Sequence, residues 1–235
     1  MKALILNSGI GKRLEPFTDE NPKCFAEVNG KNLLQRQLEQ LSYFGIKDII
    51  ITTGHFEGKI RTFVENNFTG LNVTYIRNPK YDSTNYIYSM WLTKHLIDDD
   101  ILLLHGDMIF DKKFLRDILF STSDNCVLVN NAMEPPQKDF KAEVINNRVK
   151  KIGVKVFGKN AFFLAPIYKF SKEGFNILLQ EIDKFVNAGN VNVYAEDAFN
   201  NISDSLKLSP VYYGSELCME IDDKEDLMIA RKLFK

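Results

Sequence analysis

The residues best suited to chemistry lie in a glycine-containing stretch near the N-terminus, residues 6–23. Gly9 and Gly11 carry no Cβ, so the backbone N–H groups around them can approach an anion closely. Three positive charges follow within the same stretch: Lys12, Arg13 and Lys23. Small residues combined with clustered cations favour the binding of a polyphosphate.

This glycine loop stands where open α/β sheets bind ligands. An apolar run, Ala3 to Leu6, predicts a strand before the loop, and a helical pattern follows from about Lys31. In such sheets ligands bind at the carboxyl ends of the strands. The sequence of this loop does not match the patterns of two common phosphate-binding loops. Arg13 stands where a P-loop needs Ser or Thr, and Leu14 stands where a dinucleotide fingerprint needs glycine.

Two aspartates follow apolar strands and could hold a metal. Asp107 comes after the run 101–105, which puts its carboxylate at the same sheet edge as the glycine loop. Asp222 follows residues 219–221 and precedes a terminal helical pattern. Because Mg²⁺ prefers oxygen ligands, the pair predicts a magnesium site. Each aspartate also has a structural interpretation: a Gly-Asp turn for the first, and a helix N-cap with Glu225 for the second.

The order of helical and strand patterns predicts the fold class. Strand, helix and strand alternate over the first 77 residues, which favours parallel strands joined by right-handed crossovers. Strands are expected at 3–6, 48–53, 72–77, 101–105, 125–130, 162–170, 211–213 and 218–221, with short strands around turns at 146–147 and 158–159. Helices are expected at 32–44, 57–66, 85–92, 112–120, 172–187, 197–202 and 223–235, with Ser83 or Thr84 capping the third. We therefore expect an α/β protein with a Rossmann-like, doubly wound, mixed but mostly parallel sheet.

Length and composition limit the classes of protein to consider. At 235 residues the chain suits one domain, residues 1–235, with a small β insertion at about residues 133–160. With 30 basic and 31 acidic residues the net charge is −1, which offers no electrostatic case for binding nucleic acid or an anionic membrane. The three cysteines form no Cys-x-x-Cys pair, and no run approaches the ~20 apolar residues that cross a bilayer. These features predict a soluble cytoplasmic protein.

The glycine loop resembles the signature of the nucleotidyltransferases that activate sugar 1-phosphates and phosphocholine. Its Gly-x-Gly-x-Arg-Leu, followed by an Asn-Pro-Lys that ends at Lys23, is similar to the family's Leu-Ala-Ala-Gly-x-Gly-x-Arg-Leu and Pro-Lys. Asn7 and Ser8 stand in place of the two alanines. The resemblance implies a nucleotidyltransferase fold and a set of nucleotide-binding residues: Leu6, Asn7, Ser8, Gly9, Gly11, Lys12, Asn85 and Ser89.

Other segments extend the resemblance over most of the chain. Residues 106–107 (Gly-Asp) and 220–222 (Glu-Ile-Asp) are similar to the family's metal-binding segments, which implies that Asp107 and Asp222 hold Mg²⁺. Residues 78–89 resemble the bacterial phosphocholine-type cytidylyltransferases, with Tyr86 in place of an asparagine. The implied partners are CTP and a small phosphorylated acceptor.

The resemblance also implies the reaction: an acceptor phosphate attacks the α-phosphorus of CTP and releases pyrophosphate. A phosphate monoester has a second pKa of ~6, so it is already an anion and needs no strong general base. Positioning and charge neutralisation remain as the protein's tasks. Arg13 is implied to hold the leaving β- and γ-phosphates, and Lys23 to bridge the α-phosphate and the acceptor phosphate.

We expect the acceptor to be a small phosphate or phosphonate that bears an amine. Glu196 and Asp197 form an acidic pair at a late short helix, where they could pair with an ammonium group, and Tyr86 could add a cation–π contact. The competing interpretation is that the acidic pair caps its helix and that Tyr86 packs in the core. Residues 133–143 show no aromatic cage, which favours a primary amine or an amino acid-like acceptor over choline.

Two alternative functions stay open. One is a sugar-1-phosphate nucleotidyltransferase of the same fold, although the short chain favours the small-acceptor branch. The other is a non-catalytic nucleotide-binding regulatory module, against which the complete set of cations and metal carboxylates argues. The sequence does not indicate the oligomeric state.

Overall fold

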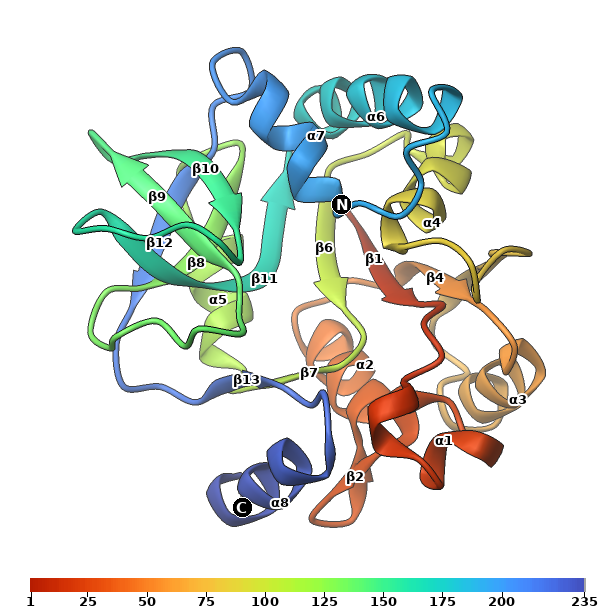
Figure 1. The fold of residues 1–235 in the computed structure, drawn as a ribbon. Helices are drawn as coiled ribbons and strands as arrows, with labels where there is room; N and C mark the ends of the chain where they lie inside the picture. The colour runs from red at the N-terminus through yellow and green to blue at the C-terminus, as the bar shows by residue number, and fades with distance from the viewer. Residues whose placement is uncertain (235) are drawn as a thin grey trace.

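One mixed sheet of nine strands is formed within residues 1–234, the part of the chain that the computed structural model describes (Figure 1). Along its main path the strand order is β10-β9-β11-β6-β1-β4-β5, and β8 pairs with β11 and β12. Four consecutive strands of this order run parallel, with β5 at the edge: β6 (Ile101–His105), β1 (Lys2–Asn7), β4 (Asp48–Thr53) and β5 (Asn72–Arg77). Their carboxyl ends therefore meet at one edge of the sheet.

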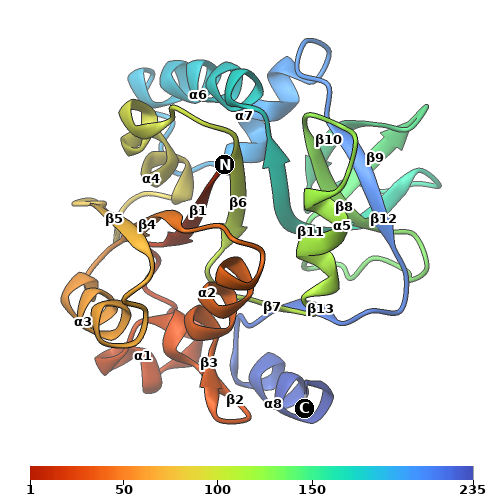
Figure 2. The same ribbon diagram turned by 180° about the vertical axis from the view of Figure 1, so that it is seen from behind.

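The two faces of this sheet carry separate hydrophobic cores because strand side chains alternate. On β1, Ala3 and Ile5 join the core under α2, α3 and α5 (Figure 2), whereas Leu4 and Leu6 join the core under α4, α6 and α7. The helices are α2 (Leu33–Tyr43), α3 (Glu57–Asn67), α4 (Tyr86–Leu92), α5 (Lys113–Leu119), α6 (Lys172–Asn187) and α7 (Ala195–Ile202). Burial on both faces explains the continuous apolar runs of β1 and β6. None of the helices in residues 1–234 is long and apolar enough to cross a membrane.

The second half of the sheet is built around one long strand, β11. It pairs antiparallel with β6 and β8, and its first residues pair with β9. A hairpin joins β9 to β10 through Asn146 and Asn147, which both have positive φ as a two-residue hairpin turn requires. The bounds are β8 (Cys126–Asn130), β9 (Lys141–Ile145), β10 (Arg148–Gly153), β11 (Ala161–Phe170) and β12 (Ser209–Tyr213). The hairpin falls in the expected insertion and extends the same sheet.

A two-stranded sheet, separate from the main sheet, joins a segment near the C-terminus to a segment near the middle of the chain. β13 (Cys218–Glu220) runs antiparallel to β7 (Met108–Phe110), and the N–H of Ile221 donates to the carbonyl of Asp107 at 2.9 Å. α8 (Lys224–Leu233) and the hairpin of β2 (Glu27–Val28) and β3 (Lys31–Asn32) then share a third, smaller core. Asp222 is thereby held next to Asp107.

The expected α/β class and its mixed sheet are confirmed, with corrections at two helix starts. Asn85 caps α4 by accepting a hydrogen bond from the N–H of Tyr86, so neither Ser83 nor Thr84 is the cap. Asp223, and not its neighbour at 222, caps α8. The sequence did not predict the four-residue α1 (Phe17–Glu20), the β2–β3 hairpin or β7, which are too short to show a periodicity. Residue 235, the last of the predicted terminal helix, lies outside the described residues.

Candidate active site

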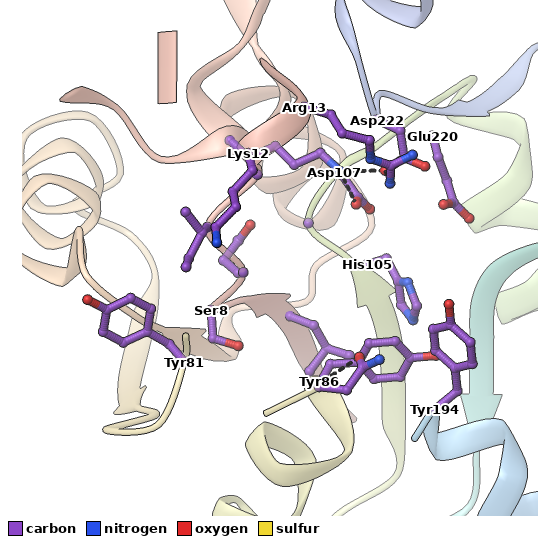
Figure 3. A pocket seen from close by; sticks show the side chains of 18 of the residues that line it. Ser8, Lys12, Arg13, Tyr81, Tyr86, His105, Asp107, Tyr194, Glu220 and Asp222 are labelled. Carbon is purple, nitrogen blue, oxygen red and sulfur yellow. Dashed lines mark hydrogen bonds and ion pairs between the residues drawn. The ribbon is translucent and has the colours of Figure 1, made fainter. Parts of the chain in front are cut away.

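A cavity of about 980 Å³ opens at the carboxyl ends of β1 and β6 (Figure 3). The glycine loop and Tyr81 lie at one end, His105 and Tyr194 lie at the other, and Asp107 lies between them. Most of the predicted site residues line this cavity: Leu6, Asn7, Ser8, Gly9, Gly11, Lys12, Arg13, Lys23, Asn85, Tyr86, Asp107 and Asp222. Three predicted residues do not line it: Ser89, Glu196 and Asp197.

Close backbone approaches fix the glycine loop and the neighbouring strand end. Gly11 has a φ of 75°, a conformation that favours glycine, and a Cβ there would lie 3.0 Å from the Cβ of Lys23. The following residues, 12–14, form a 3-10 turn in which Leu14 is buried. A Cβ on Gly106 would lie only 2.8 Å from the backbone carbonyl oxygen of Leu6, as well as 1.8 Å from the side-chain Oδ1 of Asn7. Glycine is therefore needed in both motifs to let the chain pass.

Ser89 supports the glycine loop from beneath. Its side chain is fully buried, and its Oγ lies 2.6 Å from Oγ of Ser8 and accepts a hydrogen bond from Nδ2 of Asn78 at 3.0 Å. The prediction that Ser89 approaches the nucleotide or the acceptor is therefore corrected, because it reaches the cavity only through Ser8. Asn85 lines the cavity while its side chain caps α4.

Lys23 lies between the two predicted metal ligands. Its Nζ donates to Oδ2 of Asp107 at 2.6 Å and to Oδ1 of Asp222 at 2.8 Å, and Arg13 contacts the same Asp222 oxygen at 2.9 Å. Burial opposes the charge of Lys23, but the two carboxylates outweigh it and raise the pKa above the ordinary lysine value. Burial would also raise the pKa of Asp107, but Lys23 holds it below the usual value. Lys23 and Asp107 therefore keep their charges at neutral pH.

Asp222 is available for this cluster because its neighbour caps the last helix. The side chain of Asp223 accepts hydrogen bonds from the N–H groups of Glu225 and Asp226, at 2.9 and 3.0 Å. The backbone N–H of Asp222 donates to the Asp226 carboxylate at 3.0 Å. The helix-cap interpretation of Asp222 is therefore wrong, and its carboxylate faces the cavity.

Three carboxylates form a candidate magnesium site. One oxygen each from Asp107, Glu220 and Asp222 lies within 4.8 Å of the others. Oδ1 of Asp107 and Oε1 of Glu220 are buried, and neither has a hydrogen-bond partner within residues 1–234. Burial, and then repulsion by Asp107 and Asp222, raises the pKa of Glu220 well above its ordinary value. A set of oxygen donors with buried, unpartnered atoms fits Mg²⁺.

Glu220 was not among the metal ligands expected from the sequence, although it belongs to the quoted segment 220–222. Its signal was its place two residues before Asp222, because positions i and i+2 of an extended chain point to the same side. The strand pairing of β13 with β7 turns that side toward Asp107.

Aromatic rings from separate segments line the other end of the cavity. The Tyr86 ring centroid lies 4.8 Å from that of His105 and 6.0 Å from that of Tyr194, and Phe140 packs edge-on against Tyr194 at 4.9 Å. We call Tyr86, Phe140 and Tyr194 the aromatic wall; Figure 3 shows Glu220 facing the same space. The sequence did not reveal this wall, because its three rings come from separate segments and only Phe140 lies within residues 133–143.

Glu196 lies behind the aromatic wall and acts on the cavity through Tyr86. It is 5% exposed and accepts hydrogen bonds from the hydroxyls of Tyr86 and Tyr168. Burial and the charge of Glu196 raise the pKa of Tyr86 well above its ordinary value. Asp197 accepts from the N–H of Tyr194 at 3.1 Å and completes the capping box of α7. The expected direct contacts of this acidic pair with the acceptor are therefore corrected.

The fold and the site together define a nucleotidyltransferase: a cation-rich glycine loop at a strand end, facing carboxylates that can hold a divalent metal. The family model of the MobA-like NTP transferase domain matches residues 3–218, and the chain belongs to this family. The choline-phosphate cytidylyltransferase of Streptococcus pneumoniae is 34% identical over 122 residues, which are 52% of this chain and 52% of that protein. The CMP-5'-(3-aminopropyl)phosphonate synthase of Streptomyces rubellomurinus is 26% identical over 135 residues, 57% of this chain and 22% of that protein.

Structural similarity extends over the whole chain. The CTP:phosphocholine cytidylyltransferase structure from Streptococcus pneumoniae matches with a TM-score of 0.85 at 24% identity, covering 100% of this chain and 99% of that chain. At this identity the match establishes the shared nucleotidyltransferase fold. Sugar-1-phosphate nucleotidyltransferases are also among the homologues.

Proposed function

We propose that this nucleotidyltransferase is a cytidylyltransferase that transfers CMP from CTP to a small phosphate or phosphonate bearing an amine. The observation that carries the proposal is the end of the cavity opposite the glycine loop, where the aromatic wall stands beside the buried carboxylate of Glu220. An ammonium group there meets the faces of the aromatic wall. Cation–π contacts of this kind contribute about 0.5–2 kcal/mol, more when they are desolvated.

The nucleotide occupies the glycine-loop end of the cavity. Backbone N–H groups of residues 8–12 hold the triphosphate, as in other anion-binding loops. Arg13, whose side chain is 63% exposed, can turn from Asp222 to the leaving β- and γ-phosphates. Lys23 lies at the junction of the two ends and contacts the α-phosphate and the acceptor phosphate.

The reaction itself needs positioning and charge neutralisation. The acceptor phosphate, with a second pKa of ~6, supplies an anionic oxygen at neutral pH. Its attack forms a bond to the α-phosphorus and breaks the bond to the oxygen that bridges the α- and β-phosphates, which leaves with the electron pair as pyrophosphate. Asp107 and Asp222, with Glu220 beside them, are the residues that would hold Mg²⁺, and the bound ion would neutralise phosphate charge.

Two of the relatives described above act on acceptors of the proposed class, one on choline phosphate and one on an aminopropylphosphonate. The sugar-phosphate alternative is supported by the sugar-handling homologues. A non-catalytic module would have no use for Lys23 between two cavity carboxylates. The acceptor end of the cavity therefore decides between the two transferase functions.

A pyrophosphate-release assay tests the proposal. Four nucleoside triphosphates are each combined with phosphocholine, phosphoethanolamine, aminoethylphosphonate and glucose 1-phosphate, with Mg²⁺ present. We expect the fastest release from CTP with an amine-bearing acceptor. Faster turnover of glucose 1-phosphate would assign the sugar-phosphate function instead, and no release with any pair would favour the non-catalytic module.

A further inference from the structure

A buried lysine lies immediately behind the wall of the cavity. Lys141, the first residue of β9, is 1% exposed. Its Nζ donates to the carbonyl oxygens of Gln137 at 3.0 Å, Asp139 at 2.8 Å and Val154 at 2.9 Å. These three bonds use every donor of the ammonium group. A buried charge costs free energy unless its partners are well arranged, so this arrangement calls for a reason beyond filling space.

The three carbonyls belong to the two chain segments that the ammonium joins. One is the segment of residues 137–140, which has no helix or strand of its own, and the other begins directly after β10. Lys138, Asp139, Phe140 and Val154 line the cavity. Lys141 thus holds together two parts of the cavity wall without reaching the cavity itself.

Few other bonds fix the segment 137–140. The N–H of Leu164 donates to the carbonyl of Phe140 at 3.0 Å, the N–H of Asp139 donates to the carbonyl of Pro136 at 3.4 Å, and the half-exposed Lys138 pairs with Asp226 at 2.8 Å. None of these contacts fixes the carbonyls on both sides of Lys138. Phe140, at the end of the segment, packs against Tyr194 in the aromatic wall, so the position of that ring depends on the backbone that Lys141 holds.

We propose that Lys141 is a positioning residue that sets the shape of the acceptor end of the cavity. It acts by fixing the backbone of residues 137–140 against the end of β10, which places Phe140 in the aromatic wall. The assignment of that end to the acceptor rests on the proposed function. The glycine loop comes from a different part of the chain, so the nucleotide end does not depend on Lys141.

The test compares Lys141→Met with Lys169→Met. Lys169 is also buried, at 8% exposure, and it donates to the backbone carbonyl of Ser121 at 2.7 Å. Unlike the segments that Lys141 joins, neither Lys169 nor Ser121 belongs to the cavity lining. We expect Lys141→Met to raise the KM for the acceptor by roughly 10- to 100-fold, because a small misplacement of binding groups can cost that much. The KM for CTP should stay unchanged, and Lys169→Met should lower the melting temperature without changing either KM.

Hydrogen exchange gives a readout that does not need catalysis. The amides that report on residues 137–140 are those of Asp139 and Leu164, which donate to the carbonyls of Pro136 and Phe140. In Lys141→Met these amides should exchange faster than in the wild type, and in Lys169→Met they should not. If Lys141→Met does not fold, Lys141→Arg serves instead. Its planar guanidinium cannot direct three N–H groups from one atom, so the same faster exchange and a smaller rise in acceptor KM are expected.

The kinetic comparison uses whichever acceptor the wild type turns over fastest. A wild type that prefers a sugar phosphate would refute the proposed acceptor class and would leave the comparison of the two lysines intact. An acceptor KM that changes equally in both variants, or slow exchange at residues 137–140 in the Lys141 variant, would show that the ammonium only stabilises the fold.

Discussion

The two ends of the cavity are built in different ways. The glycine-loop end comes from consecutive residues that follow one strand, and it offers backbone N–H groups and cations. The opposite end collects single side chains from α4, β6, β13 and two loops, and it offers aromatic faces and buried carboxylates. A contiguous backbone loop binds what all triphosphates share, whereas side chains drawn from separate segments can be exchanged one at a time. Selectivity for the acceptor is therefore expected at the second end.

The largest effect should come from the carboxylates between the two ends. Asp107→Asn and Asp222→Asn should each lower turnover by at least roughly 10²–10³-fold, the range seen when one group that stabilises transition-state charge is lost. Turnover and its dependence on Mg²⁺ are measured by pyrophosphate release. Asp223→Asn is the matched control: the neighbouring side chain caps α8, and asparagine caps equally well, so turnover should not change. Near-normal turnover in the Asp107 variant would show that this residue only forms a turn.

The next largest effect should distinguish the roles of two cations at the glycine-loop end, Lys23 and Arg13. Lys23 is buried between two carboxylates, whereas Arg13 is largely exposed and contacts only one. Lys23→Ala should mainly lower kcat, because its contacts change as charge moves at the α-phosphorus. Arg13→Ala should mainly weaken binding of the triphosphate. Titration of CTP against both variants decides the matter, and the same loss of affinity in both, with kcat intact, would contradict this division.

A smaller effect should appear at the aromatic wall and depend on the charge of the acceptor. Tyr194→Leu should weaken binding of an ammonium-bearing acceptor by about 0.5–2 kcal/mol, the range of a cation–π contact. The control acceptor is the neutral analogue of phosphocholine in which carbon replaces nitrogen. Its KM should be nearly the same for the wild type and the variant. If both acceptors lose equally, the ring contributes apolar contact and no recognition of charge.

The smallest effects are expected for the acidic pair of α7. Glu196→Gln keeps a hydrogen-bond partner for Tyr86 but removes the negative charge behind it, so the acceptor KM should rise by a few-fold at most. Asp197→Asn should alter only the capping of α7, a change of below about 1 kcal/mol in stability. Acceptor KM values and thermal unfolding of both variants are compared. An equal rise of the acceptor KM in both would mean that Asp197 also reaches the acceptor.

The sequence was most informative where a function depends on neighbouring residues. The glycine loop and Asp107 could be placed because each directly follows a strand of recognisable pattern. The sequence could not show that Asp223, and not Asp222, caps α8, since both precede the same helix and only the pairing of β13 fixes which one turns inward. The sequence predicts that Glu196 pairs with an ammonium group of the acceptor, but its place in the first turn of α7 points it at two tyrosine hydroxyls. The aromatic wall depends on contacts between distant segments, which no local pattern records.

Because β13 pairs with β7, the site is completed late in synthesis on the ribosome. Lys23 and Asp222 are 199 positions apart, yet their side chains meet in one cluster. At a synthesis rate of about 5–20 residues per second, Asp222 is added to the chain roughly 10–40 s after Lys23. During that time a growing chain can complete β1, its glycine loop and β6, but it has no second aspartate to place beside Asp107. The candidate metal site can therefore form only after Asp222 has left the exit tunnel.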